Sequence, residues 1–382
     1  MKFIQRLKYG LVRIFKTVFR GCYRLLALLI PEDEDKVVFV VSRSKELEGN
    51  LKFIRDEIIV QKPNAKIHLI FPENKMNLKL FKELFTLMGA QYLILDDYYL
   101  PVYLIKPKKS LKIIQLWHAA GAFKKFGYST IDKAFGSDLA YLKLVPIHSN
   151  YTHVYVSSGN MVKHYAEAFN MSSENIFPLG IPRTDMFSDD EYKKEVIKKI
   201  THDYKALVSS KVVILFAPTY RAANKQKESE IDFVETLYKV SKGLDKDKIL
   251  VYKPHPYLIK ESIGKLRDCT NIIVAEEYSI NEWMLVSDAF ITDYSSAIFE
   301  YAILQQPLAH FVPDLLEYET NRGLYYPIEK ISDGEIIKEY DQLINWINKR
   351  NKNENWNTVN MLEFNYDNII NSSKKITTHF LT

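Results

Sequence analysis

Cysteine, dinucleotide-binding motifs and long apolar runs are scarce or missing in this chain of 382 residues. With only two cysteines, Cys22 and Cys269, the sequence excludes a disulfide framework and a cysteine metal site, and it fits a reducing cytoplasm. No Gly-x-Gly-x-x-Gly motif occurs, which argues against a dinucleotide cofactor. The longest uncharged stretch of the N-terminal segment, residues 25–31, is too short to cross a bilayer.

Length and composition describe a soluble globular protein with more than one domain. The chain is too long for one ordinary core, and its 47% hydrophobic and 26% charged residues are typical of globular proteins. The net charge of +5 is unevenly spread, because residues 1–31 hold seven basic side chains and no acidic one. A nucleic-acid-binding protein would carry its basic stripe on the folded body among aromatic residues, so nucleic acid is not expected as a partner.

The basic N-terminal segment has helical periodicity. On a helical wheel, six of its basic side chains fall within an arc of roughly 80°, and apolar side chains occupy much of the rest. These six are Lys2, Arg6, Arg13, Lys16, Arg20 and Arg24. Residues 1–31 are therefore predicted to form an amphipathic helix on an anionic membrane surface, which would place the protein peripherally at the cytoplasmic face of the cell membrane. A helix packed on the body or on a partner chain, and a targeting signal, are the alternatives.

Short β-branched runs alternate with helical patterns in the rest of the chain, which favours parallel, doubly wound sheets. The first series of expected strands covers residues 37–41, 66–71, 92–95, 112–116, 153–157 and 176–179. After a charged helical stretch at residues 189–203, a second series covers residues 211–216, 248–252, 271–275, 289–292 and 307–312, and the pattern is helical from about residue 335. We expect two Rossmann-like domains, residues 32–195 and 196–382, that face each other across a cleft.

Polar residues follow the strands of the second series, at the edge where parallel sheets bind their ligands. Thr219 and Arg221 follow the first of these strands, and Lys253 and His255 follow the next on a stiff, proline-flanked turn. Two more strands end in Ala-Glu-Glu at 275–277 and in Ile-Thr-Asp-Tyr-Ser-Ser at 291–296, where the serine pair would cap a helix whose N–H groups face a diphosphate. Each group alone fits a surface or capping role, but together they predict a nucleotide-type donor site.

A histidine ends an apolar run in the first half of the chain. Residues 112–118 read Lys-Ile-Ile-Gln-Leu-Trp-His, and small residues follow at 119–122. His118 is therefore a candidate general base in the cleft, with a buried, hydrogen-bonded histidine as the alternative. The two Asp-x-Asp motifs, residues 33–35 and 245–247, precede strands and so lie at the wrong edge of the sheet for a metal-dependent transferase, which predicts no metal site.

Five segments carry recognisable motifs: Trp-His-Ala-Ala-Gly-Ala-Phe-Lys-Lys-Phe-Gly at 117–127, Gly-Ile-Pro-Arg-Thr-Asp at 180–185, Ala-Pro-Thr-Tyr-Arg at 217–221, Tyr-Lys-Pro-His-Pro at 252–256 and Thr-Asp-Tyr-Ser-Ser at 292–296. In this order they resemble the CDP-glycerol glycerophosphotransferase family of teichoic acid synthesis. The resemblance implies a GT-B-like fold, CDP-glycerol or CDP-ribitol as donor, CMP as product, and no metal or other cofactor. It also implies a membrane-bound acceptor saccharide linked to undecaprenyl diphosphate, which agrees with the basic helix.

The resemblance also assigns roles to residues. His118 resembles the family's general base, and His255 resembles its second essential histidine, which acts on the donor phosphates. Many members read His-Gly-Thr-Pro where this chain has Ala-Ala-Gly after His118, which leaves the acceptor and the alditol open. The donor-binding positions that we expect are Gly121, Arg183, Pro218, Thr219, Arg221, Lys253, Thr292, Asp293, Ser295, Ser296 and Glu300.

The length leaves room for one catalytic module and its helix, so we expect a priming enzyme that adds a first glycerol phosphate to the lipid-linked saccharide. A ribitol-phosphate transferase or a short polymerase is the alternative within the family. Outside the family, a UDP-sugar epimerase with the same architecture would not need the basic helix, and a non-enzymatic membrane scaffold would leave the strand-end residues unexplained. The oligomeric state, a homo-oligomer included, is left open.

Overall fold

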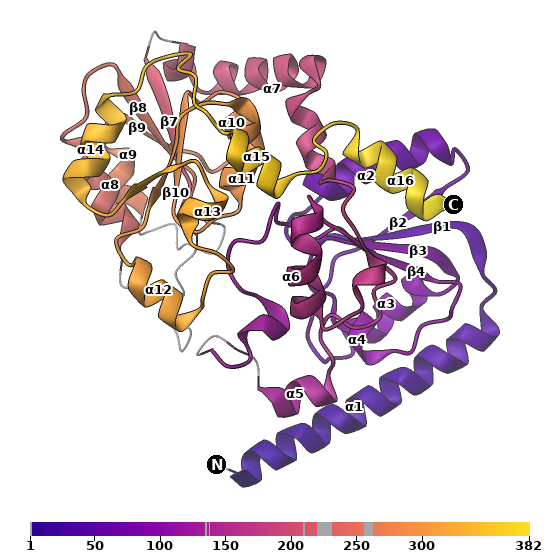
Figure 1. Cartoon of the computed structure of the whole chain (residues 1–382). Coiled ribbons are helices and arrows are strands. Elements are labelled where there is room, and N and C mark those ends of the chain that lie inside the picture. Colours follow the sequence, from indigo (N-terminus) through magenta and orange to yellow (C-terminus); the bar gives the residue numbers. More distant parts are fainter. Residues whose placement is uncertain (1, 134–135, 137, 209–210, 220–230, 256–262) are drawn as a thin grey trace.

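Two parallel six-stranded sheets form the body of the protein, each within its own α/β domain (Figure 1). The computed structural model describes residues 2–133, 136, 138–208, 211–219, 231–255 and 263–382. Every strand pair of the two sheets is parallel, and helices connect successive strands. The architecture predicted from alternating strand and helical patterns is thereby confirmed.

The first sheet has the strand order β2-β1-β3-β4-β5-β6. Its strands are β1 (Asp33–Val40), β2 (Lys66–Ile70), β3 (Ala90–Leu95), β4 (Lys112–Gln115), β5 (His153–Tyr155) and β6 (Ile176–Phe177). The helical segments are α2 (Gly49–Gln61), α3 (Lys79–Leu87), α4 (Leu100–Leu104), η1 (Gly127–Thr130), α5 (Leu139–Leu144), α6 (Gly159–Phe169), η2 (Ser173–Asn175) and η3 (Pro182–Phe187). Val38 packs into the core on one face of the sheet and Phe39 into the core on the other, which is why β1 reads as a continuous apolar run.

Helix α7 (Asp190–Asp203) leads into the second sheet, whose strand order is β12-β11-β10-β7-β8-β9. Its strands are β7 (Val212–Phe216), β8 (Lys248–Tyr252), β9 (Ile272–Val274), β10 (Ala289–Thr292), β11 (Leu308–Phe311) and β12 (Glu335–Ile337). The helical segments are η4 (Lys205–Val208), α8 (Phe233–Ser241), α9 (Gly264–Arg267), α10 (Ile280–Met284), α11 (Ala297–Tyr301), η6 (Ala302–Leu304), α12 (Leu315–Asn321), α13 (Ile328–Ile331), α14 (Tyr340–Asn348) and α15 (Val359–Asn365).

In each sheet the strand order reverses at one place, between β1 and β3 in the first sheet and between β10 and β7 in the second. Loops that leave the two strands at such a point run in opposite directions, and the crevice between them is the usual ligand site of an open α/β sheet. The loops after β1, β3, β7 and β10 are therefore the places where functional side chains are expected to meet.

Two features of the C-terminal part differ from the prediction. Residues 335–337, expected to be helical, form the edge strand β12, because pairing with β11 outweighs the local pattern of so short a segment. Helix α16 (Ser372–Leu381) does not close the second domain but packs on the first, beside α2 (Figure 1). Phe380 enters the core around Phe39, and the Asp185 carboxylate accepts the N–H groups of Ser372 and Ser373, both at 2.8 Å. The last helix thus ties the two domains together.

The N-terminal segment forms one helix, α1 (Lys2–Leu29), that lies along the first domain (Figure 1). One of its faces packs on the body, since Phe19 and Tyr23 are buried and the Phe19 ring lies 5.1 Å from that of Phe81 on α3. The Tyr9 hydroxyl donates to Asp138 at the start of α5, at 2.6 Å. The predicted helix is confirmed, and packing on the body accounts for one of its faces.

Candidate active site between the two sheets

His118 leaves the end of β4 through a strained residue. Trp117 has a φ of 50°, in the left-handed region that a bulky side chain rarely occupies. Two buried amides hold it there: the Trp117 N–H donates to Gln115 Oε1, and Asn50 Nδ2 donates to the Trp117 carbonyl, both at 2.8 Å. Such strain persists only where neighbours fix it, and it is common at functional sites. Here it turns the chain so that His118 follows directly on the strand end.

The hydrogen bond of His118 selects its tautomer. Nδ1 lies 3.1 Å from the carbonyl oxygen of Asp96, which can only accept, so Nδ1 carries the proton and Nε2 holds the lone pair. The pKa of His118 is lowered to about 3, chiefly by burial and then by the charge of Arg43, while the Asp97 carboxylate, 3.9 Å from Nδ1, opposes both. The ring is therefore neutral near pH 7 and can accept a proton at Nε2.

Arg43 and Asp97 form an ion pair across the switch point of the first sheet. Arg43 follows β1 and Asp97 follows β3, and Nε lies 2.6 Å from the carboxylate. Burial alone would raise the pKa of Asp97, but its coupling to the His118 ring and the charge and hydrogen bond of Arg43 hold this pKa below its usual value. Asp97 is thus an anion beside His118, able to stabilise the imidazolium after proton transfer.

Lys253 follows β8 in the second domain. We call the strand-end loops of the first domain around His118 the first wall of the site, and those of the second domain around Lys253 the second wall. Its N–H donates to the Phe216 carbonyl at 2.9 Å, and its ammonium donates to the carbonyls of Glu276 and Glu277 at 3.2 and 3.1 Å. The predicted Ala-Glu-Glu segment therefore contributes backbone oxygens to this wall. Burial lowers the pKa of Lys253 to about 8, opposed by Glu282 and by Glu48 of the first domain, so the side chain is still a cation at neutral pH.

His255, two residues after Lys253, is affected by charges of the first domain. Its pKa is lowered to about 4, first by burial and then by the charges of Arg43 and Lys124, while Asp293 acts in the opposite direction. Arg43 also lowers the pKa of His118, so one guanidinium influences both histidines. The two histidines that the sequence singled out in different halves of the chain are thus under the influence of the same charge. An arriving diphosphate would reverse the effect of the cations on His255 and favour its protonation.

Asp293 joins the loops after β7 and β10. Its carboxylate accepts the Thr219 N–H and the Thr219 hydroxyl, both at 2.8 Å, and its own carbonyl lies 2.8 Å from His310 Nδ1. Thr292 donates to the Ala217 carbonyl at 2.6 Å, and Pro218 is buried beside it. Asp293 and Thr292 are themselves fully buried. These expected donor-binding residues therefore shape the two loops, and Thr219 is the one of them that is partly exposed.

The serine pair precedes a helix, as the sequence predicts. Ser295 Oγ accepts the Ala297 N–H at 3.3 Å, whereas Ser296, the N-cap of α11, makes no side-chain cap bond. Both serines are partly exposed beside the Asp293 loop. α11 itself is short, covering only Ala297–Tyr301 before it continues as a 3-10 turn. Arg221, the remaining predicted donor contact of this wall, lies outside the described residues.

Arg183 and Glu300 form a buried bridge between the domains. Arg183 Nε lies 2.8 Å from Glu300 Oε2, a second contact joins the guanidinium to Oε1, and Asn281 Nδ2 donates to Oε2 at 2.5 Å. Arg183 also donates to the His118 carbonyl at 3.1 Å, and its N–H donates to Asn50 at 3.1 Å. Glu300 is only 1% exposed, so this pair does not project into the cleft as expected of donor contacts but fixes the backbone at His118.

Gly121, expected as a donor-binding position, lets the two domains pack closely instead. Its φ is 65°, and a Cβ at this position would lie 2.8 Å from the Phe299 ring and 2.6 Å from Asn365 Oδ1. The small residue therefore lets the second domain pack against the loop after β4, where a larger side chain would push the two domains apart. It is buried and faces protein, so we expect no direct contact with the donor.

The Asp-x-Asp motifs lie at strand starts, as expected. Asp33 and Asp35 open β1 and lie 2.8 Å from Lys66 and Lys62, while Asp247 precedes β8 and lies 2.9 Å from Lys248. In the described part of the chain, no group of three or more histidine, cysteine, aspartate or glutamate side chains is placed to hold a metal ion.

Sequence reasoning missed Asn50, Arg43 and Asp97. A signal for the last two was present, because both follow strands that end at the same edge as β4. Asn50 had none, since it lies inside the first turn of α2 and reaches the Trp117 carbonyl only through the tertiary fold.

Comparisons with known proteins identify the family of this chain. Residues 22–376 match the family model described as CDP-Glycerol:Poly(glycerophosphate) glycerophosphotransferase. The teichoic acid ribitol-phosphate primase of Bacillus spizizenii is 39% identical over 88% of each chain. The teichoic acid glycerol-phosphate primase of Bacillus subtilis is 29% identical over 75% of this chain and 71% of its own. The ribitol-phosphate polymerase TarK of Staphylococcus aureus is 32% identical over 86% of this chain but 64% of its own.

Solved structures show the same fold. A structure of the wall teichoic acid polymerase TagF aligns with 99% of this chain and 98% of its own, with a TM-score of 0.74 and 20% identity. The UDP-GlcNAc 2-epimerase of Methanocaldococcus jannaschii aligns with 90% of this chain and 99% of its own, with a TM-score of 0.54 and 13% identity. At these identities the likeness concerns the fold alone.

Proposed function

The chain belongs to the CDP-glycerol:poly(glycerophosphate) glycerophosphotransferase family and is a CDP-alditol phosphotransferase of teichoic acid synthesis, and we propose that it acts as a primase. It transfers one alditol phosphate to a hydroxyl of a saccharide linked to a polyprenyl diphosphate and releases CMP. The observation that carries the chemistry is His118, a neutral imidazole with its lone pair at Nε2 and the Asp97 anion beside it. The match to a ribitol-phosphate primase over 88% of both chains supports priming.

Ribitol is the alditol that we propose. The sequence patterns placed glycerol first and kept ribitol as the alternative. The ribitol-phosphate primase is 39% identical to this chain and the glycerol-phosphate primase 29%, which supports ribitol. Two parallel sheets, each with a switch point where open α/β sheets bind ligands, support the GT-B-type arrangement that the sequence resemblance implies.

The geometry suggests how the residues share the reaction. His118 Nε2 removes the proton of the acceptor hydroxyl as its oxygen attacks the alditol-bearing phosphorus, and Asp97 stabilises the imidazolium. The bond between this phosphorus and the CMP oxygen breaks. Lys253 and a protonated His255 neutralise the charge that develops on the departing CMP. Positioning and electrostatic stabilisation therefore supply most of the rate, as is usual in phosphoryl transfer.

A donor comparison tests this proposal. The full-length protein is incubated with a saccharide acceptor on a short soluble tail and with either CDP-ribitol or CDP-glycerol, and the products are weighed by mass spectrometry. We expect a single ribitol phosphate to be added, with CMP released in equal amount. A ladder of added units would identify a polymerase. A product from CDP-glycerol alone would show that the transferred alditol is glycerol and not ribitol.

We also propose that α1 holds the enzyme peripherally on the cytoplasmic face of the membrane. No helix of the described residues is long and apolar enough to span a bilayer. The face of α1 that points away from the body instead exposes a row of large apolar side chains, which we call the α1 apolar stripe. Its members, 52–85% exposed, are Ile4, Leu7, Leu11, Ile14, Val18, Leu25, Leu28 and Leu29.

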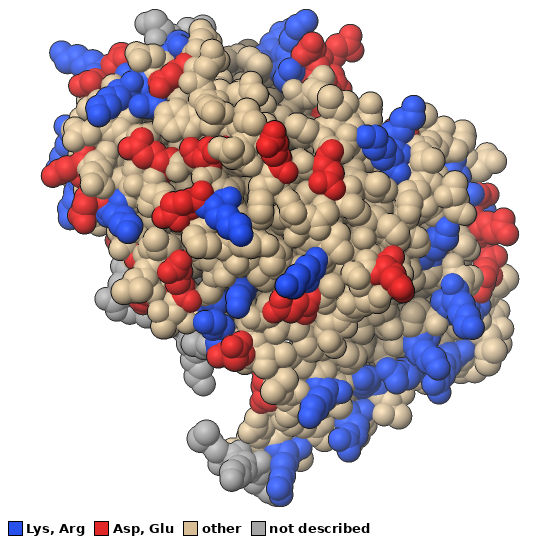
Figure 2. All heavy atoms as spheres, in the orientation of Figure 1, with Lys and Arg blue, Asp and Glu red and all other residues tan. Residues whose placement is uncertain are grey.

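Basic side chains accompany this stripe and suit an anionic lipid surface. Figure 2 shows Lys and Arg gathered along α1 at the lower edge of the molecule. Arg6, Arg13 and Arg24 are exposed, whereas Lys16 and Arg20 donate to the carbonyls of Leu144 and Leu104, at 2.6 and 3.1 Å. The electrostatic part of membrane binding thus comes from fewer residues than the six expected, and the apolar stripe supplies the rest. Sedimentation with anionic vesicles tests this.

A further inference from the structure

The loop after β1 carries a half-exposed arginine at the switch point of the first sheet. The side chain of Arg43 is 50% exposed, and the Asp97 carboxylate holds its Nε at 2.6 Å. The next turn of the loop is closed by the Ser44 hydroxyl, which donates to the Glu46 carbonyl at 2.5 Å. Among the described residues, no hydrogen bond engages the two terminal nitrogens of the Arg43 guanidinium. The guanidinium is therefore anchored at Nε and can donate to a ligand from its other end.

The same loop acts on the second wall at two places. The charge of Arg43 lowers the pKa of His255. Glu48, which precedes α2 at the end of this loop, opposes the lowering of the Lys253 pKa, and Lys253 in turn opposes the raising of the Glu48 pKa. The loop after β1 and the loop after β8 are thus near each other, with Arg43 towards His255 and Glu48 towards Lys253.

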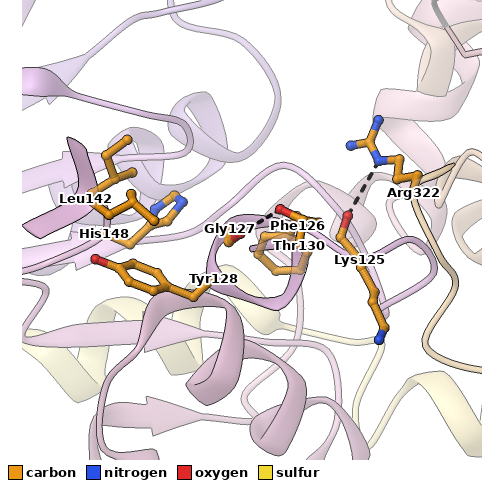
Figure 3. Close-up of a pocket in the computed structure, with 9 residues that line it drawn as sticks. Lys125, Phe126, Gly127, Tyr128, Thr130, Leu142, His148 and Arg322 are labelled. Carbon is orange, nitrogen blue, oxygen red and sulfur yellow. Dashed lines mark hydrogen bonds between the residues drawn. The ribbon is translucent and has the colours of Figure 1, made fainter. Parts of the chain in front are cut away.

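Backbone contacts fix the position of the two walls relative to each other. Lys124 of the first domain pairs in strand-like fashion with Leu324 of the second, and the Lys125 N–H donates to the Gly323 carbonyl at 3.0 Å. Arg322 Nε donates to the Lys125 carbonyl at 3.4 Å, and Figure 3 shows this bond at the edge of a cavity of about 190 Å³. The charges of the first wall therefore have a fixed place relative to the second.

The proposed reaction requires the transferred phosphorus to lie between the two histidines. In a displacement at phosphorus, the attacking and the leaving oxygens lie roughly in line on opposite sides. His118 takes the proton of the attacking hydroxyl and His255 acts on the leaving CMP, so each histidine marks one end of this line. The non-bridging oxygens of the phosphate then project sideways from its middle. Arg43 lies beside the line, because its charge acts on both histidines and it shares the Asp97 carboxylate, 3.9 Å from Nδ1, with His118.

We propose that Arg43 is a further catalytic residue, which donates from its terminal nitrogens to the non-bridging oxygens of the alditol phosphate while this group is transferred. The inference rests on the proposed function and adds to it a phosphate contact from the first wall. The second wall holds the donor before the reaction, and Arg43 acts on its phosphate during the transfer.

The step is balanced without a proton on the arginine. As the acceptor oxygen bonds to phosphorus, its proton goes to His118 Nε2, and the electron pair of the bond between phosphorus and the bridging oxygen leaves with CMP. Arg43 stabilises the negative charge of the phosphoryl oxygens, which its planar fork matches. Asp97 then has two tasks, because it orients the Arg43 guanidinium and stabilises the imidazolium.

Steady-state kinetics at saturating donor and acceptor test this assignment. In Arg43→Gln, kcat should fall by about 10²- to 10³-fold, the usual effect of removing a donor that stabilises charge in the transition state. The donor KM should stay within about threefold, because Lys253 and His255 hold the bound donor. Arg43→Lys should lower kcat by about tenfold or more, since one ammonium cannot bind Asp97 and form a fork to phosphate. Lys45→Gln, which changes an exposed cation of the same loop, is the matched control and should leave kcat unchanged.

The pH dependence of kcat separates contact with phosphate from an indirect effect through His118. The charge of Arg43 lowers the pKa of His118, so removing it raises this pKa and leaves more of the ring protonated at low pH. If that were the whole role of Arg43, kcat of Arg43→Gln would return to the wild-type value between about pH 6 and about pH 8.5. We expect the same loss throughout this range. Recovery at high pH would overturn the proposal, and so would a loss that disappears at high acceptor concentration, because Arg43 would then bind the acceptor.

Sulfur substitution of the donor tests the contact directly. CDP-ribitol with sulfur in place of one non-bridging oxygen of the ribitol-bearing phosphate exists as two diastereomers, and sulfur accepts hydrogen bonds poorly. For one of them the wild-type kcat should fall about tenfold or more, whereas Arg43→Gln should show little further loss, because the contact is already gone. Equal sulfur effects in the wild type and in Arg43→Gln, for both diastereomers, would overturn the proposal.

The wild-type protein separates this inference from the proposed function. If it releases no CMP from CDP-ribitol or CDP-glycerol in the presence of the acceptor, the proposed function fails. Normal transfer by the wild type together with a wild-type kcat of Arg43→Gln would overturn the role of Arg43 alone.

Discussion

The two walls of the cleft hold their histidines in different ways. His118 is fixed through its backbone, since Asn50 binds the carbonyl before it and Arg183 binds its own carbonyl, and it has a carboxylate 3.9 Å away. The charges of Arg43 and Lys124 instead lower the pKa of His255, and the carboxylate that opposes them, Asp293, is already bound to Thr219. Burial lowers the pKa of both histidines. A neighbouring carboxylate stabilises a histidine that has gained a proton, whereas neighbouring cations stabilise a bound anion. We infer that the first wall is arranged for proton transfer and the second for binding phosphate.

Removing each histidine tests this division with the largest expected effect. His118→Ala should lower kcat by about 10²- to 10⁴-fold, the usual contribution of a general base, and leave the KM for the donor nearly unchanged. His255→Ala should lower turnover by about 10²-fold and also raise the donor KM. The rate of CMP release as a function of donor concentration measures both, with circular dichroism as the control for folding. Identical changes in kcat and donor KM for the two variants would contradict the division into a proton-transfer wall and a phosphate-binding wall.

Glu300→Gln tests the buried bridge behind the first wall. Arg183 would keep its charge without a counterion, and breaking a buried pair in this way costs about 3–5 kcal/mol of the free energy of unfolding. The His118 carbonyl would also lose its fixed partner, so kcat should fall while the donor KM stays the same. Urea denaturation and steady-state kinetics measure the two effects.

Glu329→Gln is the control for Glu300→Gln, because Glu329 on α13 is exposed. A rise in donor KM with unchanged kcat in Glu300→Gln would mean that Glu300 contacts the donor, as the sequence resemblance implied, and that its bridge to Arg183 opens when the donor binds.

The pH dependence of donor binding tests whether the charge of Lys253 contributes to the second wall. Because Lys253 has a pKa of about 8 instead of 10.5, it is a cation below pH 8 and loses its charge above it. Donor KM should therefore be flat below pH 7 and rise, by about tenfold, as the pH passes through 8. The free energy of unfolding should increase over the range in which donor affinity falls. Burying a charged Lys253 destabilises the fold below pH 8, and this penalty fades between pH 8 and pH 10.5 as the side chain loses its proton.

Lys253→Arg is the matched variant for this pH profile. Arginine keeps its charge at all accessible pH values, so the rise of donor KM near pH 8 should disappear. A profile unchanged by this substitution would assign the titration to another group.

The α1 apolar stripe should have the smallest effect on chemistry. Leu11→Ser with Ile14→Ser removes two exposed apolar side chains, so sedimentation with anionic vesicles should fall, while CMP release with a short-tailed acceptor should be unchanged. Leu316→Ser on α12, where the side chain is 80% exposed, is the control. High salt should release only part of the wild-type protein, because apolar burial is not screened. Unchanged sedimentation together with loss of a dimer would mean that a second copy of the chain covers the stripe.

Several parts of the fold and site could be predicted because their signals are local. Strands such as β8 (Lys248–Tyr252) and β10 (Ala289–Thr292) have the predicted bounds, since each is a short apolar run between clear helical patterns. His118, Lys253 and His255 could be found because they follow such runs directly. By contrast, Asn50 lies inside a helix, and nothing nearby in the chain distinguishes it from ordinary helical residues. Glu300 was expected to contact the donor, and its buried bridge to Arg183 has no local signal in the sequence.

The sequence by itself determined the alternation of strands and helices, the strand ends that carry the chemistry, the basic helix and the family. These depend on periodicities and motifs within a few residues, where the backbone geometry decides which side chains share a face or an edge. Only the tertiary structure decided that Arg183 faces Glu300, that α16 returns to the first domain and that Asn50 holds the backbone before His118. Such contacts join residues far apart in the chain, and they form only when two domains pack and bury the charges together.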